Sequence, residues 1–150
     1  MDPKKILVGV DASENSLRAV AYVAEIVGPG SGFEVELLCV DRVPVKDLYP
    51  SEDAWAKAAE DQQAKIREFL AKARDLLAAK GFDPDRLNAR CVAAEGPSIA
   101  TAIVEEQRAG GFGTVVVGPR GLSKAEEFLL GSVSTRVVHL AKGCAIWVVG

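Results

Sequence analysis

Five short apolar runs alternate along the chain with longer amphipathic segments, and this alternation limits the possible folds more than any other feature. The first run, KKILVGV, is apolar almost without interruption, as is typical of a strand buried on both faces. The predicted strands cover residues 4–10, 33–40, 87–94, 114–118 and 144–150. In between, apolar residues recur at helical intervals, and the predicted helices cover residues 13–27, 51–80, 96–110 and 132–142.

The order strand, helix, strand, repeated through the chain, predicts the α/β class. Right-handed crossovers then give an open, doubly wound, parallel five-stranded sheet of Rossmann-like form, with helices on both faces. A length of 150 residues suits one domain with one core, and we find neither a repeat nor an interdomain linker. Residues 1–150 are therefore expected to form a single domain, with residues 41–50 as its one sizeable irregular stretch.

Composition excludes several classes of partner. The net charge is −3 and no basic stripe occurs, so we expect no nucleic acid partner. The apolar runs are far shorter than a membrane-spanning helix, and the opening residues do not read as a signal peptide, so no membrane association is expected. Three cysteines at wide spacing, Cys39, Cys91 and Cys144, suggest a reducing cytoplasmic location with free, buried, structural thiols.

In an open α/β sheet, ligands bind beyond the carboxyl ends of the strands, so the loops from strand to helix are the places to search. The glycine clusters at 28–32 and 110–113 follow helices instead, and are expected to form turns. Neither a dinucleotide-binding fingerprint in the right place nor a Walker A sequence occurs. Three strand-to-helix loops remain as candidates.

Two of these loops follow the first and second strands. Asp11 stands where the first strand ends, and its carboxylate either caps the adjoining turn and helix or faces a ligand crevice. The end of the second strand reads CVDRV, and its backbone could meet the edge of a nucleotide base. The residues alone leave the two readings of Asp11 open.

The third loop runs from Gly118 to Ser134. Gly118 and Gly121 allow the backbone to approach an anion closely, and Gly131 precedes the last predicted helix. The N-terminus of a helix presents unpaired N–H groups and suits phosphate. The alternative is an ordinary loop with a glycine at each bend and a serine cap, and the residues alone do not choose between the two.

The spacing Gly118-x2-Gly121-x9-Gly131-Ser132 resembles the nucleotide-binding pattern G-x2-G-x9-G-[S/T] of the universal stress protein family. ILVGVDASENSLRAV resembles the opening strand and helix of that family, FLLGSVS its last loop, and CAIWVV its closing strand. The resemblance covers nearly the whole chain. It implies strand order 3-2-1-4-5, which reverses between the first and fourth strands, so that Asp11 and Gly118 would border one crevice.

The resemblance also implies a site for ATP, as in the ATP-binding branch of the family. Asp11 would lie near the adenine or ribose, and the Val40 backbone would meet the adenine edge. Gly118 and Gly121 would line the path of the ribose and phosphates. The phosphates would receive hydrogen bonds from four consecutive residues: Gly131, Ser132, Val133 and Ser134. A divalent ion such as Mg²⁺ would be held mainly by phosphates and water.

The resemblance further implies a homodimer through the last strand, Cys144 to Val149, and a regulatory, stress-response role with an unidentified protein partner. No general base is evident, and His139 is expected on a helix surface, so we expect no catalysis beyond a slow ATPase. A slow nucleotide hydrolase is the alternative, and a receiver-like signalling domain ranks below it. Pro119, Glu126 and Glu127 depart from the family pattern, and the two carboxylates oppose anion binding unless they point outward or help to hold a metal.

Overall fold

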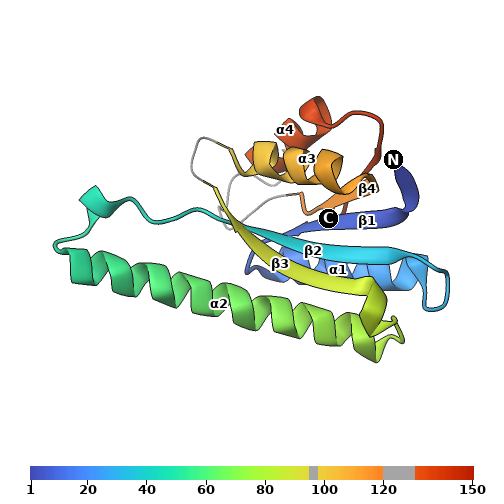
Figure 1. Ribbon diagram of the computed structural model, residues 1–150, viewed down its shortest axis with the longest axis horizontal. Helices are drawn as coiled ribbons and strands as arrows, with labels where there is room; N and C mark the ends of the chain where they lie inside the picture. The colour runs from blue at the N-terminus through green and yellow to red at the C-terminus, as the bar shows by residue number, and fades with distance from the viewer. Residues whose placement is uncertain (95–97, 120–130) are drawn as a thin grey trace.

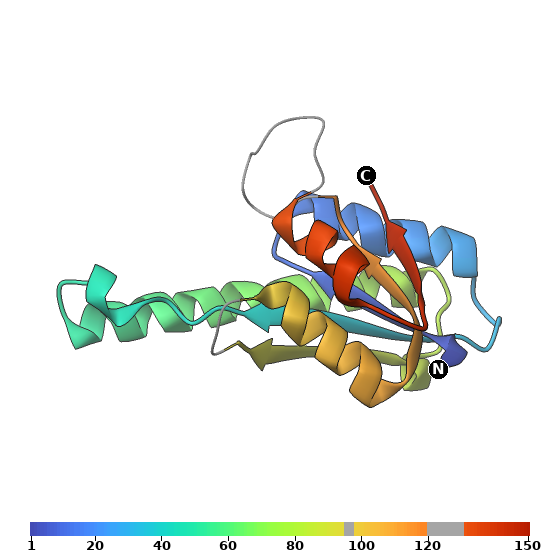
Figure 2. The ribbon, with the colours of Figure 1, turned by 90° about the horizontal axis from the view of Figure 1, so that it is seen from above.

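The computed structural model describes residues 1–94, 98–119 and 131–150, and it contains one five-stranded parallel sheet (Figures 1 and 2). The strand order is β3-β2-β1-β4-β5, which confirms the predicted order and the α/β class. The strands are β1 (Asp2–Val10), β2 (Glu34–Asp41), β3 (Leu87–Ala93), β4 (Phe112–Val117) and β5 (Ala145–Val148). The order reverses between β1 and β4, while β3 and β5 form the two edges.

Helices cover both faces of the sheet, as Figure 1 shows. On one face lie α1 (Glu14–Val27) and α2 (Glu52–Ala79), and on the other α3 (Ile99–Gly110) and α4 (Ser132–Leu140). The central strand β1 alternates accordingly: Ile6 and Val8 belong to the core under α1 and α2, and Leu7 to the core under α3 and α4. All three side chains are fully buried, which explains the uninterrupted apolar run in the sequence.

The first helix begins and ends as its sequence predicts. The Ser13 side chain caps α1 by accepting a hydrogen bond from the Ser16 N–H, and Gly28 follows the helix with a φ of 66° that favours glycine. The glycines of the following turn, Gly30 and Gly32, also have positive φ. The cluster at residues 28–32 is therefore a turn, as predicted.

Only the second half of α2 packs into the core. Its buried residues are Ile66, Phe69, Leu70, Ala73 and Leu77. A 28-residue helix is about 42 Å long and an eight-residue strand about 27 Å, so the first half extends beyond the sheet (Figure 1). There it contacts the preceding loop, where the Trp55 indole donates a 2.6 Å hydrogen bond to the Pro44 carbonyl. The sequence predicted α2 as a helix with recurring apolar residues. It did not show that the first half of this helix would extend past the end of the sheet.

Candidate functional site

The carboxyl ends of β1 and β4 lie side by side where the strand order reverses. Val8 pairs with Val116, and continuing that register places Gly118 opposite Val10. Asp11 follows β1 directly, so Asp11 and Gly118 leave neighbouring strands at the same edge of the sheet. Figure 2 shows the N-terminal ends of α1 and α4 at this same edge. This is the position where ligands bind in open α/β sheets.

Asp11 organises the turn between β1 and α1. Its Oδ1 atom accepts hydrogen bonds from the hydroxyls of Ser13 and Ser16, the latter at 2.8 Å. The Ser16 hydroxyl in turn accepts the Asp11 N–H at 2.8 Å, and Ser16 is 5% exposed. Asp11 is therefore not the helix cap, which is Ser13, but it holds the cap in place. Its second oxygen, Oδ2, has no hydrogen-bond partner within residues 1–94, 98–119 and 131–150.

Val40 lies one residue past the last pair that joins β2 to β1, which is Cys39 with Val10. Successive carbonyls of a strand point alternately toward its two neighbours. The Asp41 carbonyl accepts the Ala94 N–H at 2.9 Å on the β3 side, so the Val40 carbonyl points toward the β1 side, where β1 has already ended. The side chain of Val40 is buried in the core under α3. Its backbone is the part directed at the edge of the site.

Asp41 is a polar residue at this edge that the sequence analysis did not single out. It is 6% exposed, and its Oδ1 accepts a hydrogen bond from the Gln62 amide of α2. Gln62 also donates to the Arg42 carbonyl at 2.9 Å, so it fixes the end of β2 through two contacts. The available signal was the position of Asp41, which ends the second strand as Asp11 follows the first.

A single carbonyl joins the end of β4 to the start of α4. Pro119 accepts hydrogen bonds from the Gly131 N–H at 2.5 Å and from the Ser134 hydroxyl at 3.0 Å. Pro119 departs from the family pattern, and the structure gives its carbonyl a role as an acceptor. The predicted residues Gly121, Glu126 and Glu127 lie outside the described residues. The two ends of the intervening segment are thus held together by backbone contacts.

The N-terminus of α4 is arranged as a group of N–H donors. Gly131 is the N-cap and supplies no side chain, so no capping hydrogen bond forms. The N–H groups of Ser132, Val133 and Ser134 have no acceptor in the described part of the chain. The first N–H groups of any helix have no partner within the helix itself. No acidic side chain lies in this first turn. The side chain of Ser132 is exposed, while that of Ser134 is buried and donates to backbone carbonyls.

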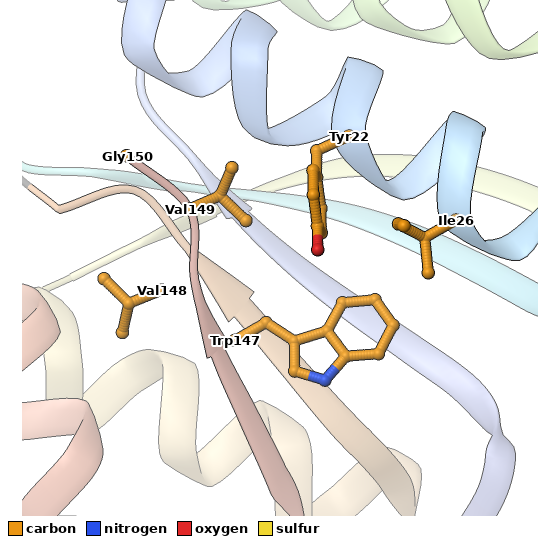
Figure 3. A pocket seen from close by; sticks show the side chains of 6 residues that line it. All are labelled: Tyr22, Ile26, Trp147, Val148, Val149 and Gly150. Atoms are coloured by element: carbon orange, nitrogen blue, oxygen red, sulfur yellow. The ribbon is translucent and has the colours of Figure 1, made fainter.

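The exposed edge of the sheet near the C-terminus carries a separate apolar surface. Figure 3 shows Tyr22 and Ile26 of α1 facing Trp147 of β5 around a small pocket. The rings of Tyr22 and Trp147 meet edge to face, with centroids 6.5 Å apart. Tyr22 and Ile26 are 44% and 57% exposed, which is high for large apolar side chains. This surface adjoins the strand for which the sequence predicted a dimer contact.

A sequence model of the universal stress protein family matches residues 3–150, and the chain belongs to this family. A universal stress protein of Mycolicibacterium smegmatis is 28% identical over 146 residues, which cover 97% of this chain and 48% of that protein. The chain thus spans about half the length of this curated relative. No helix among the described residues is long and apolar enough to cross a membrane.

Solved structures of the family share the fold. A universal stress protein in complex with cAMP is 26% identical, with a TM-score of 0.70, and the match covers 97% of this chain and 96% of that one. A universal stress protein from Archaeoglobus fulgidus in complex with dAMP is 18% identical, with a TM-score of 0.66, and the match covers 100% and 98% of the two chains. Some structural neighbours of this chain therefore bind adenine nucleotides.

Proposed function

We propose that this chain binds ATP at the carboxyl edge of the sheet and acts as a regulatory module of the stress response. The observation that carries the proposal is the meeting of Asp11, Val40, Gly118 and the α4 N-terminus where the strand order reverses. Family relatives that bind cAMP and dAMP support an adenine nucleotide as the ligand. The resemblance to the ATP-binding branch of the family favours ATP, whose phosphates would meet the N–H donors of the α4 N-terminus.

The adenine and ribose would occupy the β1–β2 side of the site. The Val40 carbonyl points past the end of β1 and suits the exocyclic amino group of adenine, which is a hydrogen-bond donor. The Oδ2 atom of Asp11 suits a ribose hydroxyl, since Oδ1 already accepts from Ser13 and Ser16. Asp11 would then hold the turn through Oδ1 and bind the ligand through Oδ2.

The phosphates would occupy the β4–α4 side. Gly118 and Gly121 would line the path toward the helix, and Gly131, Ser132, Val133 and Ser134 would surround the phosphates at the positive end of the helix dipole. Ser132 can contribute its N–H and its exposed hydroxyl. Ser134 would contribute its N–H, because its hydroxyl donates to the Pro119 and Gly131 carbonyls.

A Mg²⁺ ion would accompany the phosphates. Within residues 1–94, 98–119 and 131–150 we find no cluster of three acidic, histidine or cysteine side chains. Mg²⁺ commonly keeps several waters and binds through substrate phosphates, so we expect the nucleotide and water to hold most of this ion.

Regulation is favoured over catalysis by the residues at the site. Asp11 and Asp41 both accept hydrogen bonds from protein groups, and His139 is exposed on α4 with its Nδ1 atom 2.8 Å from the Thr135 carbonyl. A slow ATPase that uses Asp11 to orient water is the alternative. The family match favours either of these functions over a receiver-like domain.

We further propose a homodimer through residues 144–149. Among the described residues β5 pairs with β4 alone, and the surface formed by Tyr22, Ile26 and Trp147 lies beside its other edge (Figure 3). A second copy would pair with β5 and cover these apolar side chains. Sedimentation of Ala145→Lys would test this, since Ala145 is the exposed residue of β5 and a charge there is expected to shift a dimer to monomer. The cytoplasmic location and the regulated protein partner also stay predictions.

Mass spectrometry of the ligand released from purified protein tests the central proposal. We expect ATP to be released intact, and ATP added with Mg²⁺ to bind in calorimetry without turnover well above the uncatalysed rate. Turnover that Asp11→Asn abolishes would establish the hydrolase instead. The absence of both co-purified nucleotide and measurable binding of ATP, cAMP or AMP would refute nucleotide binding.

A further inference from the structure

Two cysteines face one another across β2 and β3. Cys39 and Cys91 are direct partners in the parallel register, so their side chains lie on the same face of the sheet. The sequence analysis predicted three buried thiols, but only Cys39 is buried, whereas Cys91 is exposed and Cys144 is partly exposed. The chain therefore has one accessible thiol beside one buried thiol on the same face of the sheet.

The spacing of this pair suits a covalent bond. Neighbouring strands lie about 4.8 Å apart, which falls within the range of about 4.4–6.8 Å that the Cα atoms of a disulfide span. No cysteine pairs with Cys144 in the register of β4 and β5, where the partner of Ala145 is Thr114. The geometry thus distinguishes one pair from the third cysteine.

The buried member of the pair lies next to the proposed nucleotide site. Cys39 precedes Val40, and it pairs with Val10, the last residue of β1 before Asp11. A disulfide brings its two Cβ atoms to about 3.8 Å, so it would draw β2 toward β3 at this point. The Val40 carbonyl would move with it, away from the end of β1.

We propose that Cys39 and Cys91 form a reversible disulfide, and that its formation weakens the binding of adenine nucleotide at Val40. The first half of this proposal concerns the pair alone. The second half rests on the nucleotide site proposed above.

Hydrogen peroxide is the oxidant in the simplest reaction. The Cys91 thiolate attacks one peroxide oxygen, the O–O bond breaks, hydroxide leaves, and the sulfur becomes a sulfenic acid. The Cys39 sulfur, having lost its proton, then attacks the Cys91 sulfur, the S–O bond breaks, and a second hydroxide leaves. With the two thiol protons, the products are one disulfide and two waters. A dithiol reductant returns two electrons and two protons by thiol–disulfide exchange.

Burial and the charges around Cys39 and Cys91 determine how fast the two thiols are oxidised. Burial, followed by contacts with Cys91 and by the negative charges of Asp41 and Asp11, raises the pKa of Cys39 to about 12. Burial and Asp41 also raise the pKa of Cys91, and the neighbouring α2 contributes the neutral Gln62 at Asp41. Thiolate is the reactive form, so oxidation is expected to be slow at neutral pH and faster as the pH rises.

The disulfide is tested by incubating the reduced full chain at pH 8 with excess hydrogen peroxide, then blocking free thiols and mapping peptides without reduction. We expect a Cys39–Cys91 cross-linked peptide, two protons lost per chain, and reversal by dithiothreitol. Cys144→Ser should give the same peptide, and Cys91→Ser should not. Oxidation of Cys91 that ends as sulfinic acid, or as a cross-link between chains, would overturn the proposal.

The coupling is tested by measuring ATP binding by calorimetry before and after oxidation of Cys144→Ser. We expect the affinity to fall about fivefold or more and to recover on reduction, while Cys91→Ser keeps its affinity under the same treatment. Equal affinities of the oxidised and reduced protein would refute the coupling and leave the disulfide established. Failure of the reduced protein to bind ATP would instead refute the proposed function.

Discussion

The two strand-to-helix junctions that border the site are built in opposite ways. At the β1–α1 junction, Asp11, Ser13 and Ser16 bond to one another and to the backbone through their side chains, and the Ser13 hydroxyl occupies one N–H donor of the first turn, that of Ser16. At the β4–α4 junction, the Pro119 carbonyl holds the Gly131 N–H, and the helix has no side-chain cap.

This difference bears directly on ligand binding. An N-cap side chain adds about 1 kcal/mol of stability, but it takes up an N–H group that could otherwise bind an anion. The chain forms this contact at α1 and omits it at α4. The uncapped helix is the one that the glycine spacing assigns to phosphate. The comparison therefore predicts that changes at β4–α4 affect binding, whereas changes at β1–α1 affect stability first.

The largest expected effect is that of Gly131→Val on ATP binding. A side chain at the N-cap would crowd the N–H groups of the first turn, and the loss of two charge-assisted hydrogen bonds would weaken binding by at least about a hundredfold. Gly131 has a φ of −63°, which any residue adopts, so the backbone should tolerate the change. Calorimetry measures the affinity and circular dichroism checks the fold. Gly118→Val tests the β4 end of the proposed phosphate site. Unchanged ATP affinity in both variants would show that the phosphates do not bind between β4 and α4.

Asp11→Ala is expected to lower the free energy of unfolding by about 1–3 kcal/mol, because the buried Ser16 hydroxyl loses its acceptor. Urea unfolding followed by circular dichroism measures this change. Glu14→Ala is the matched control, since Glu14 is an exposed acidic residue in the same turn and should change stability by less than about 1 kcal/mol. Equal effects of the two variants would mean that Asp11 does not organise the junction.

Gly131→Ser should move stability and binding in opposite directions. The new hydroxyl can cap α4, which stabilises the fold by a few tenths of a kcal/mol. The same contact occupies an N–H group of the first turn, so ATP affinity should fall by about tenfold. Thermal unfolding and calorimetry on one preparation would measure both. A variant that binds ATP as tightly as the parent chain would show that this donor is not used.

The smallest expected effect concerns pH. The pKa of Cys39 is raised in the folded chain, so the folded state keeps this proton more firmly than the unfolded state does. This contribution to stability is complete below the ordinary thiol pKa of about 9 and is lost as the pH rises toward 12. Urea unfolding at pH 8 and pH 10 should show lower stability at the higher pH, and Cys39→Ala should reduce that difference. The described part of the β4–α4 junction, residues 117–119 and 131–134, offers no titratable side chain for a comparable effect.

Parts of the fold and site could be predicted because they depend on local patterns. The five apolar runs located the strands to within a few residues, since strands buried on both faces are continuously apolar. The ends of α1 were located to within one residue because capping residues such as Ser13 and Gly28 have preferences that act over one turn. The family resemblance supplied the strand order, which local patterns cannot give.

Other features depend on contacts between distant residues. Asp41 meets Gln62 across 21 positions, and the predicted stripe of α2 leaves the sheet halfway along because a 28-residue helix is longer than the strand beside it. The acceptor role of Pro119 could not be predicted because the partners of its carbonyl, Gly131 and Ser134, lie beyond an eleven-residue segment (120–130). The sequence predicted a buried Cys91, whereas its side chain is exposed on the edge strand β3, because residue preferences alone do not show which positions of an edge strand a helix covers.

The sequence by itself determined the order of strands and helices, the caps of α1 and the glycines of the proposed site, because each follows from residue preferences within a few positions. Only the tertiary structure decided that Asp11 holds a turn, that Pro119 ties α4 to β4, and that Cys39 faces Cys91. The last two contacts join segments that meet only when the sheet sets their register, whereas the choice between the two readings of Asp11 depended on where its carboxylate points. A one-residue change of register between β2 and β3 would turn the two thiols to opposite faces.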